Sequence, residues 1–425
     1  MGVPLWACLA GCLVAGPTGG AATPPPAAPA FGLAYWEVMP GPMQLPVFDG
    51  MAIELGQQLV VLGGFTRELE ATRAIQIRST LDGWRPIGST MHEARARASL
   101  HAVGGGRVLV LGGYSGTWGK NATARDDGET LDPLVAGSGR DIEPFGEPLD
   151  GHGATELPGG RIAVSCGCSL RVLDLATERW SAPMELARER HHHASVLVGR
   201  TLVLIGGDDL GTIESIDLDD LDALPATDDA AVAEAPAATS LLWERGLADT
   251  AGAPLSHVAA IAIDGRMAYA AGGFRTDERT TVDRTWTVDV ARRAVVPGRP
   301  LPLPSGACDL VLTRHPRGVI VLDGEWWRDG LRGNANAALL VTRLPGADDD
   351  SSRLDWPEVW RLPGLGSSAD LAHRMLAITA QGAIEAVGGY RYRSPTEIPL
   401  DGEPAGVIVV GTGERLAVDV AGTAD

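Results

Sequence analysis

Imidazole, carboxylate, guanidinium and indole side chains are the groups of this chain that can bind a polar ligand or move a proton. Arg190-His191 opens a basic run, while Asp208-Asp209 and Glu325-Trp326 stand where a repeated pattern is broken. Carboxylates beside exposed tryptophans often recognise sugars or peptides. We therefore predict a ligand-binding set that consists of Arg190, His191, Asp208, Asp209, Glu325 and Trp326.

A second, overlapping set of side chains is suited to acid–base catalysis. It lies near the starts of expected inner strands or just after glycine pairs, and consists of Arg190, His191, His152, His257, Asp309 and Glu325. No spacing within this set singles out a catalytic pair. The sequence also lacks a nucleophile elbow, a phosphate-binding loop and a zinc-protease helix motif. Catalysis therefore stays the alternative to binding, and no cofactor is expected.

Three consecutive histidines follow Arg190, but they do not predict a metal site. Adjacent side chains of a strand point to opposite faces, so His191, His192 and His193 cannot converge on one ion. On a strand, His193 would be structural, His191 would share its side and approach the centre of the fold, and His192 would point away. We expect no bound metal.

The elements that must position these groups form a repeat. Five apolar runs end in a pair of glycines, and two weaker runs end at Gly167 and Gly324, which makes seven. The five pairs are Gly63-Gly64, Gly112-Gly113, Gly206-Gly207, Gly272-Gly273 and Gly388-Gly389. A tryptophan precedes each of these pairs by 26 to 29 residues, and the five are Trp36, Trp84, Trp180, Trp243 and Trp360.

This pattern resembles the kelch family, whose repeat combines a glycine pair after a strand, a later Trp and an Arg-x-x-His before the next strand. Arg190 and His193 match the last element. The resemblance covers about residues 31 to 421 and implies an all-β fold, a seven-bladed kelch-type β-propeller of four-stranded blades. It implies little about function, because kelch propellers serve as enzymes, adhesion modules and protein-binding platforms.

The two ends of the chain complement each other. Trp36 precedes every glycine pair, whereas Gly388-Gly389 is followed by two strand-like runs and no further Trp. We predict that residues 35–38 supply the outer strand of the last blade and close the ring, which also removes an exposed edge. Three long polar, acidic or glycine-rich stretches, 116–147, 218–239 and 326–355, are expected to be loops.

Residues 1–30 resemble an export signal followed by a Gly/Pro/Ala-rich linker, 31–421 form the predicted propeller, and 422–425 are a tail. Leu9-Ala10-Gly11-Cys12 resembles the bacterial lipobox, which implies lipidation at Cys12. The alternatives are another export signal or a cytosolic protein. We expect an exported protein that is lipid-anchored in the envelope, periplasmic or secreted, with no other membrane contact.

A formal net charge of -19 repels polyanions, so nucleic acid is not an expected partner. Cys166, Cys168 and Cys308 lack the spacing of a disulfide scaffold or zinc site. A Cys166–Cys168 bridge and free or buried thiols both remain open. We expect a monomeric, non-catalytic recognition or scaffold module for a carbohydrate or protein ligand. The alternative is a periplasmic carbohydrate epimerase or mutarotase, similar to the sialate mutarotases built from kelch repeats.

Overall fold

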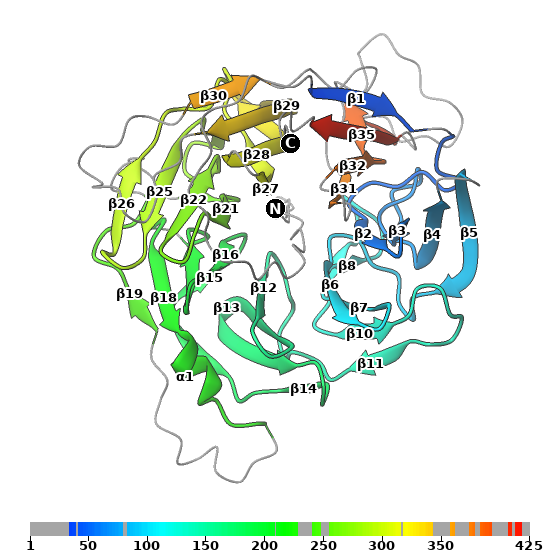
Figure 1. The fold of residues 1–425 in the computed structure, drawn as a ribbon, viewed down its shortest axis with the longest axis horizontal. Helices are drawn as coiled ribbons and strands as arrows, with labels where there is room; N and C mark the ends of the chain where they lie inside the picture. The colour runs from blue at the N-terminus through cyan, green and yellow to red at the C-terminus, as the bar shows by residue number, and fades with distance from the viewer. Residues whose placement is uncertain are drawn as a thin grey trace, which may run out of the picture.

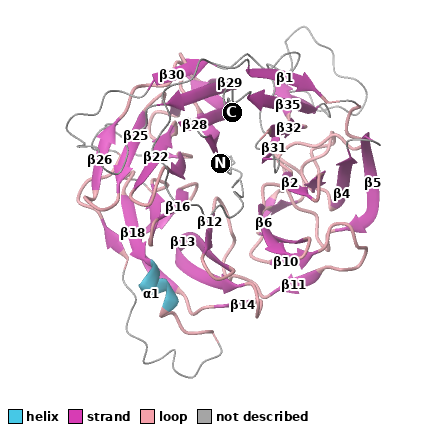
Figure 2. Ribbon diagram, in the orientation of Figure 1, coloured by secondary structure: helices cyan, strands magenta, loops and turns pink. Residues whose placement is uncertain are grey.

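The computed structural model describes residues 34–39, 41–79, 83–208, 210–227, 240–247, 255–315, 318–342, 358–361, 374–378, 383–392, 407–409 and 413–418. Strands dominate these residues, and the one helix among them is α1 (Leu218–Asp222). Figure 2 shows this balance by colour. The predicted all-β class is confirmed.

Most strands belong to seven four-stranded antiparallel sheets, which Figure 1 shows side by side around a common centre. We number the sheets along the chain and give their strands from the centre outward. Sheet 1 contains β2 (Met51–Leu55), β3 (Gln58–Leu62), β4 (Ala74–Ser79) and β5 (Gly83–Thr90). Sheet 2 contains β6 (Ser99–Gly104), β7 (Arg107–Leu111), β10 (Gly128–Leu131) and β11 (Arg140–Ile142).

Sheet 3 departs from this plan because its second strand is long and bent. It contains β12 (Gly153–Leu157), β13 (Arg161–Asp174), β14 (Arg179–Trp180) and β15 (Met184–Arg190). The first residues of β13 pair with β12, the later ones pair with β14 and β15, and the register shifts after Gly167.

The other four sheets follow in order along the chain. Sheet 4 contains β16 (Ala194–Val198), β17 (Thr201–Ile205), β18 (Ile213–Asp217) and β19 (Leu241–Leu242). Sheet 5 contains β21 (Ala259–Ala262), β22 (Met267–Ala271), β25 (Thr285–Asp289) and β26 (Ala294–Pro297). Sheet 6 contains β27 (Cys308–His315), β28 (Gly318–Arg328), β29 (Leu331–Thr342) and β30 (Glu358–Arg361). Sheet 7 contains β31 (Met375–Ile378), β32 (Ile384–Val387), β35 (Gly413–Val418) and β1 (Ala34–Val38).

Short strands extend the connections between these sheets. They are β8 (Tyr114–Ser115) with β9 (Thr123–Ala124), β20 (Leu255–Ser256) with β23 (Phe274–Arg275) and β24 (Thr280–Thr281), and β33 (Tyr390–Tyr392) with β34 (Val407–Val409).

The core lies between neighbouring sheets, which explains why the central strands are continuously apolar rather than alternating. Val203 and Ile205 of β17 pack toward sheet 5, whereas Leu202 and Leu204 pack toward sheet 3. Strand β3 divides its residues in the same way between sheets 2 and 7. Each sheet therefore needs a neighbour on both faces to bury its strands.

The repeated tryptophans occupy this core, as expected for a packing role. Trp84, Trp180 and Trp243 are all buried, each within an apolar cluster shared by two sheets. The side chains of Trp36 and Trp360 lie outside the described part of the chain.

Two of the three expected loops contain sheet strands, which corrects the sequence interpretation. Residues 116–147 include β10 and β11, and residues 326–355 include β29. Strands β10 and β11 are short, and β29 starts with polar residues directly after an expected turn, so apolar periodicity does not reveal these strands. Of residues 218–239, the first five form α1.

The ends of the chain meet in sheet 7. Strand β1 pairs antiparallel with β35, with Trp36 opposite Leu416. This is the pairing that the sequence predicts for residues 35–38, and it places an N-terminal strand outermost in a sheet of C-terminal strands (Figure 1).

Candidate functional site

The described sheets present the same two connections at one end, which we call the mouth face. There the second strand of a sheet ends in its glycines, and the chain from the preceding sheet enters the innermost strand. The registers show this, because Met51 at the start of β2 pairs with Leu62 at the end of β3. Ala194 and Ile205 are paired in the same way in sheet 4.

The glycine pairs let the connections of adjacent sheets approach closely at this face. A Cβ on Gly206 would come within 2.7 Å of the Leu255 carbonyl oxygen, in the connection that leads to sheet 5. The N–H of Gly207 donates to that same oxygen at 2.8 Å. An equivalent bond, from Gly389 N–H to Val47 O at 3.0 Å, joins sheet 7 to sheet 1. The pairs are thus contacts between sheets.

In six sheets a left-handed residue lies at the entrance to the innermost strand, with φ between 54° and 61°. We call these six residues the polar belt: Asp49, Arg97, Gly151, His192, His257 and Asp309. Their backbones connect successive sheets, since the N–H groups of Arg97, His192 and His257 donate to the belt residue of the preceding sheet at 2.7 Å. The innermost strands lie nearest the centre in Figure 1, so the belt surrounds that centre.

One pair of belt residues neutralises its own charge. Arg97 Nε lies 2.7 Å from Asp49 Oδ2, and both side chains are buried. This buried ion pair connects sheets 1 and 2 and stabilises the mouth face.

The histidine run lies in the connection before β16 and not on a strand, which corrects the expected side-chain directions. His192 is left-handed, so the alternation of a strand does not apply to it. Its ring stacks on that of His257, with centroids 4.3 Å apart and planes 8° apart. His192 therefore joins the belt instead of pointing away.

His193, in contrast, has the structural setting that the kelch pattern implies. It is buried, and its Nε2 lies 2.7 Å from Ser165 Oγ of sheet 3. Burial is the main cause that lowers its pKa, with the positive charge of Arg190 adding to it.

His191 lies at the accessible margin of the same site. Its Nδ1 donates to the Asp150 carbonyl oxygen at 3.0 Å, and its Nε2 is 3.3 Å from Glu189 Oε1. The Asp150 carboxylate accepts a hydrogen bond from the Tyr114 hydroxyl and lies 3.6 Å from His192 Nε2. The side chains of His191 and Asp150 are 40% and 39% exposed, so both are open to a ligand.

Arg190 and Asp208 are engaged within the fold. The fully buried guanidinium of Arg190 donates to Glu214 Oε2, Gly206 O and Thr212 O, at 3.1, 2.7 and 3.1 Å. The Asp208 carboxylate accepts from Thr212 N–H at 2.8 Å and from its hydroxyl at 2.6 Å. These contacts give both side chains a role in holding the glycine turn.

Arg95 repeats the role of Arg190 in sheet 2, although the sequence interpretation missed it. Its Nη1 donates to Gly112 O at 2.9 Å, and its Nε lies 3.9 Å from Glu129. The signal was available, because both arginines precede the first glycine of their pair by nearly the same number of residues. The matching histidine is missing, since Ala98 occupies its place.

Glu325 and Trp326 lie where β28 continues past Gly324 into a longer hairpin with β29. Glu325 is buried and accepts a hydrogen bond from the Tyr390 hydroxyl of sheet 7. Trp326 is half-buried and lies against Gly333, where an added Cβ would come within 2.8 Å of three indole atoms. Of this pair, the tryptophan is the side chain that a ligand can reach.

An arc of aromatic rings links the belt to this hairpin across sheets 4, 5 and 6. It starts with the His192–His257 stack and continues edge-to-face from His257 to Phe274 and from Phe274 to Trp327, each at 6.1 Å. Arg332 lies 5.2 Å from the Trp327 ring centroid. The arc combines flat rings with polar groups on one face.

A second aromatic cluster covers the junction of sheets 7, 1 and 2. Trp118 lies 5.1 Å from Phe48 and 5.6 Å from Tyr390, and Phe65 packs beside them. Phe65 and Tyr390 directly follow glycine pairs and are buried, so their rings pack between the sheets. Trp118 was not singled out from the sequence, because no repeat mark identifies it.

The remaining candidate acid–base residues are separated by the fold. His152 is buried, where its Nδ1 donates to Leu149 O at 3.1 Å and its Nε2 is 3.0 Å from Ser99 Oγ. Burial lowers its pKa to about 4. Asp309 is a buried belt residue whose carboxylate accepts from the Cys308 thiol at 3.3 Å. On the described part of the mouth face, His191 and His192 each lie beside a carboxylate, and His257 stacks on His192.

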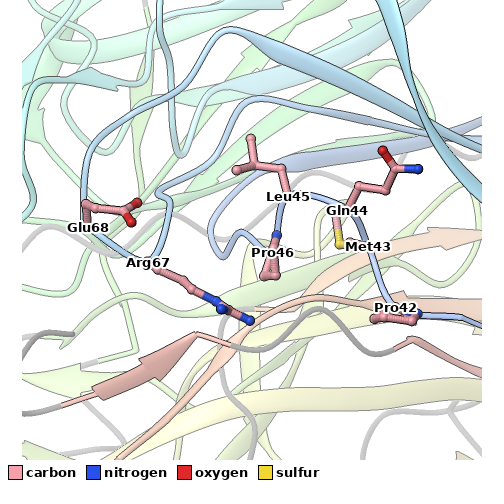
Figure 3. Close-up of a pocket in the computed structure, with 7 residues that line it drawn as sticks. All are labelled: Pro42, Met43, Gln44, Leu45, Pro46, Arg67 and Glu68. Atoms are coloured by element: carbon pink, nitrogen blue, oxygen red, sulfur yellow. The ribbon is translucent and has the colours of Figure 1, made fainter. Parts of the chain in front are cut away.

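A pocket of about 310 Å³ lies at the start of the fold, between the chain leading into β2 and the turn after β3. Figure 3 shows its lining, which consists of Pro42, Met43, Gln44, Leu45, Pro46, Arg67 and Glu68. The Gln44 amide donates to Trp84 O at 3.1 Å, so it supports the turn. No residue of the predicted ligand set lines this pocket.

Two predicted residues, Asp209 and Cys12, lie outside the described residues. Within the described ranges no group of three or more His, Cys, Asp or Glu is placed to hold a metal ion. Cys166, Cys168 and Cys308 are free thiols, of which Cys168 is exposed. In the same part of the chain, no helix has the length and apolar character that crossing a membrane requires.

Comparison with known proteins supports an all-β, propeller-like class. A solved structure titled "Structure of YjhT" is similar with a TM-score of 0.50 and 13% sequence identity, over 75% of this chain and 99% of that one. At that identity the likeness concerns the fold alone. No family model matches the chain, and no curated protein matches it.

Proposed function

We propose that the seven sheets are the blades of a kelch-type propeller, which β1 closes, and that the molecule is a recognition module with its ligand site on the mouth face. The seven four-stranded sheets, the β1–β35 pairing and the glycine contacts between sheets support the fold. The Arg95 and Arg190 networks support the kelch pattern in two of the seven sheets.

The ligand class that this face fits best is a carbohydrate. The observation that carries this proposal is the arc of rings from His192 to Trp327, with the accessible Asp150 at one end and the half-buried Trp327 of the β28–β29 hairpin at the other. Sugars present apolar C–H faces and a rim of hydroxyls, which aromatic rings, imidazoles and carboxylates match. A protein ligand remains the alternative occupant.

A glycan array probed with the purified protein tests this proposal. We expect binding to at least one glycan, and we expect Trp327→Ala to weaken it at least about tenfold while the free energy of unfolding changes by no more than about 1 kcal/mol. Leu241→Ala, on the outermost strand of sheet 4, is the control and should bind as the wild type does. An array without any bound glycan would contradict the carbohydrate proposal, and unchanged affinity of the Trp327 variant would exclude this end of the arc.

The imidazoles of the belt favour a second candidate function, carbohydrate epimerisation or mutarotation. Imidazoles are the side chains that most often act as general acids and bases, and the stacked rings of His192 and His257 lie beside the Asp150 carboxylate. NMR of a freshly dissolved sugar anomer distinguishes the two functions. A recognition module leaves the rate of anomer exchange unchanged, whereas a mutarotase accelerates it and loses this activity with His257→Ala.

The proposed setting is the cell envelope or the exterior, with the propeller following an export signal and linker. Lipidation at Cys12 belongs to this proposal and rests on the lipobox-like tetrapeptide alone.

A further inference from the structure

The accessible part of the polar belt lies where sheets 3, 4 and 5 meet, and its charge can be derived from its neighbours. We call Asp150, Glu189, His191, His192 and His257 the imidazole cluster. Gly151 makes room for it, because a Cβ there would come within 2.6 Å of the backbone nitrogen of His192 and of its ring. The side chain of Glu189 is 70% exposed, and that of His192 is 11% exposed.

Both carboxylates of this cluster have imidazoles as their ion-pair partners. Asp150 is 3.6 Å from His192, and Glu189 is 3.3 Å from His191. An imidazole, unlike a guanidinium, carries no permanent positive charge, so neither carboxylate is paired with a permanent cation. Two of the arginines nearby are engaged elsewhere, since Arg190 is tied to Glu214 and Arg97 to Asp49.

The carboxylate of Glu189 also acts on a neighbouring thiol. Desolvation, and then the negative charges of Glu189 and Glu147, raise the pKa of Cys168. The net charge of -19 adds a long-range attraction for cations. Geometry and charge together select a positively charged group at this place.

We propose that the imidazole cluster binds an amino sugar, with the ammonium group beside Asp150 and Glu189 and the neighbouring hydroxyls on the imidazoles. This inference rests on the proposed carbohydrate-binding function and adds the charge of the ligand and the part of the mouth face that reads it. Imidazoles suit hydroxyls because a neutral ring both donates and accepts a hydrogen bond. The stacked rings of His192 and His257 hold these nitrogens in a fixed relation.

Binding should also depend on pH. The titratable and charged groups that face the stacked rings are Asp150 of sheet 3, the Tyr114 phenol of sheet 2, and His152, Glu189, Arg190, His191 and His193 around them. Protonation of imidazoles on acidification adds positive charge beside the two carboxylates and reduces the net negative charge of the cluster. An ammonium ligand is then attracted less strongly, so its affinity falls on the acid side.

Isothermal titration calorimetry with glucosamine, glucose and N-acetylglucosamine tests the proposal, because these three probes differ in charge at one position. At pH 7 we expect glucosamine to bind at least about tenfold more tightly than the other two, the factor that one favourable charge contact of about 1.4 kcal/mol supplies. At pH 5.5 this preference should fall below about threefold.

Variants locate the effect. Asp150→Asn should remove most of the preference for glucosamine, and Glu189→Gln, at a more exposed carboxylate, should reduce it even if the first variant folds poorly. Asp141→Asn is the matched control, because that carboxylate is 78% exposed and pairs with His92 in sheet 2, away from the mouth face. It should leave the preference intact.

Two results would overturn the inference and can be told apart from failure of the proposed function. Equal binding of glucose or N-acetylglucosamine, or glucosamine binding that ignores both cluster variants, rejects the amino-sugar assignment while carbohydrate recognition stands. If none of the three probes binds and the glycan array is also empty, both proposals fail.

Discussion

Arg190 shows how a residue with the chemistry of a binding site can serve the fold. A buried guanidinium needs partners for its donors, and Arg190, at the end of β15 in sheet 3, finds them in a carboxylate and two carbonyl oxygens of sheet 4 and its glycine turn. The sequence marks this residue correctly as part of a repeat. It cannot show that Thr212 and Glu214 lie within hydrogen-bonding distance, because that depends on the turn after Gly207.

His192 shows where the sequence-based prediction of a side-chain direction was wrong. Strand alternation turns it away from the centre, but a left-handed backbone returns it to the belt. No residue type announces this conformation at positions 192 and 257, since histidine adopts positive φ only when the surrounding structure favours it. What the sequence does contain is a constant spacing, because in five sheets the belt residue lies two positions before the first residue of the innermost strand, while Asp309 is the second residue of β27.

Buried neutral histidines make a prediction about acid stability. The folded state lowers the pKa of His152 to about 4, whereas the unfolded chain titrates near 6.5. Between these pH values the unfolded state binds a proton at His152 and the folded state does not. The contribution of this group to the free energy of unfolding is therefore complete above pH 6.5 and is lost as pH falls toward 4. The loss from this group is about 3 kcal/mol.

Urea unfolding at pH 7 and pH 4.5 measures this effect. His152→Gln, which keeps polar groups near Leu149 and Ser99, should lose less stability on acidification than the wild type. His193 shifts in the same direction, so acid destabilisation is reduced and not abolished. An identical pH dependence in variant and wild type would show that His152 is protonated in the folded state.

At the scale of elements, apolar runs are the part of the fold that sequence predicts well. Strands such as β3, β7 and β17 are apolar on both faces and end in glycines, and each lies second in its sheet. Polar strands such as β11 carry no such signal, because their outer position leaves them partly in solvent. The hairpin of β28 and β29 was missed for a related reason, since a Gly-Glu-Trp sequence reads as a turn although the strand continues.

The first strand offers a direct test of how the fold is closed. A chain that lacks residues 1–30 should melt like the full-length protein. A chain that lacks residues 1–45 loses the β1–β35 pairing and the buried Met39 and Met43, so we expect its melting temperature to fall by at least about 5 °C. Thermal unfolding by circular dichroism compares the two truncations.

A synthetic peptide of residues 31–45 provides the control. Added to the shorter chain, it should restore most of the lost melting temperature, because it can occupy the open edge of β35. If both truncations melt together, β1 contributes nothing to stability and strand-exchange closure is wrong.

For the whole molecule, the repeat of one four-stranded sheet predicts the class of fold. The glycine contacts between neighbouring sheets determine how these sheets pack against each other. The seven sheets share the strand order and the glycine contacts, so information from one sheet transfers to the next. A ligand site has no such redundancy. It depends on residues that differ between sheets, as at the stacked histidines of sheets 4 and 5. Each such residue occurs once in the sequence, so the repeat does not predict it.

The pairing of β1 with β35 also determines the order in which the molecule can be completed. During synthesis β1 leaves the ribosome long before β35. The partner of β1 therefore exists only after the chain has been synthesised as far as Val418. Closing so long a loop costs only slightly more entropy than closing a short one, but the contact forms late. After β35 has been synthesised and before β1 pairs with it, β35 has an unpaired edge. The β1 strand of a second copy fits this edge equally well. The β1–β35 pairing that completes one molecule is therefore also the place where two molecules can exchange strands.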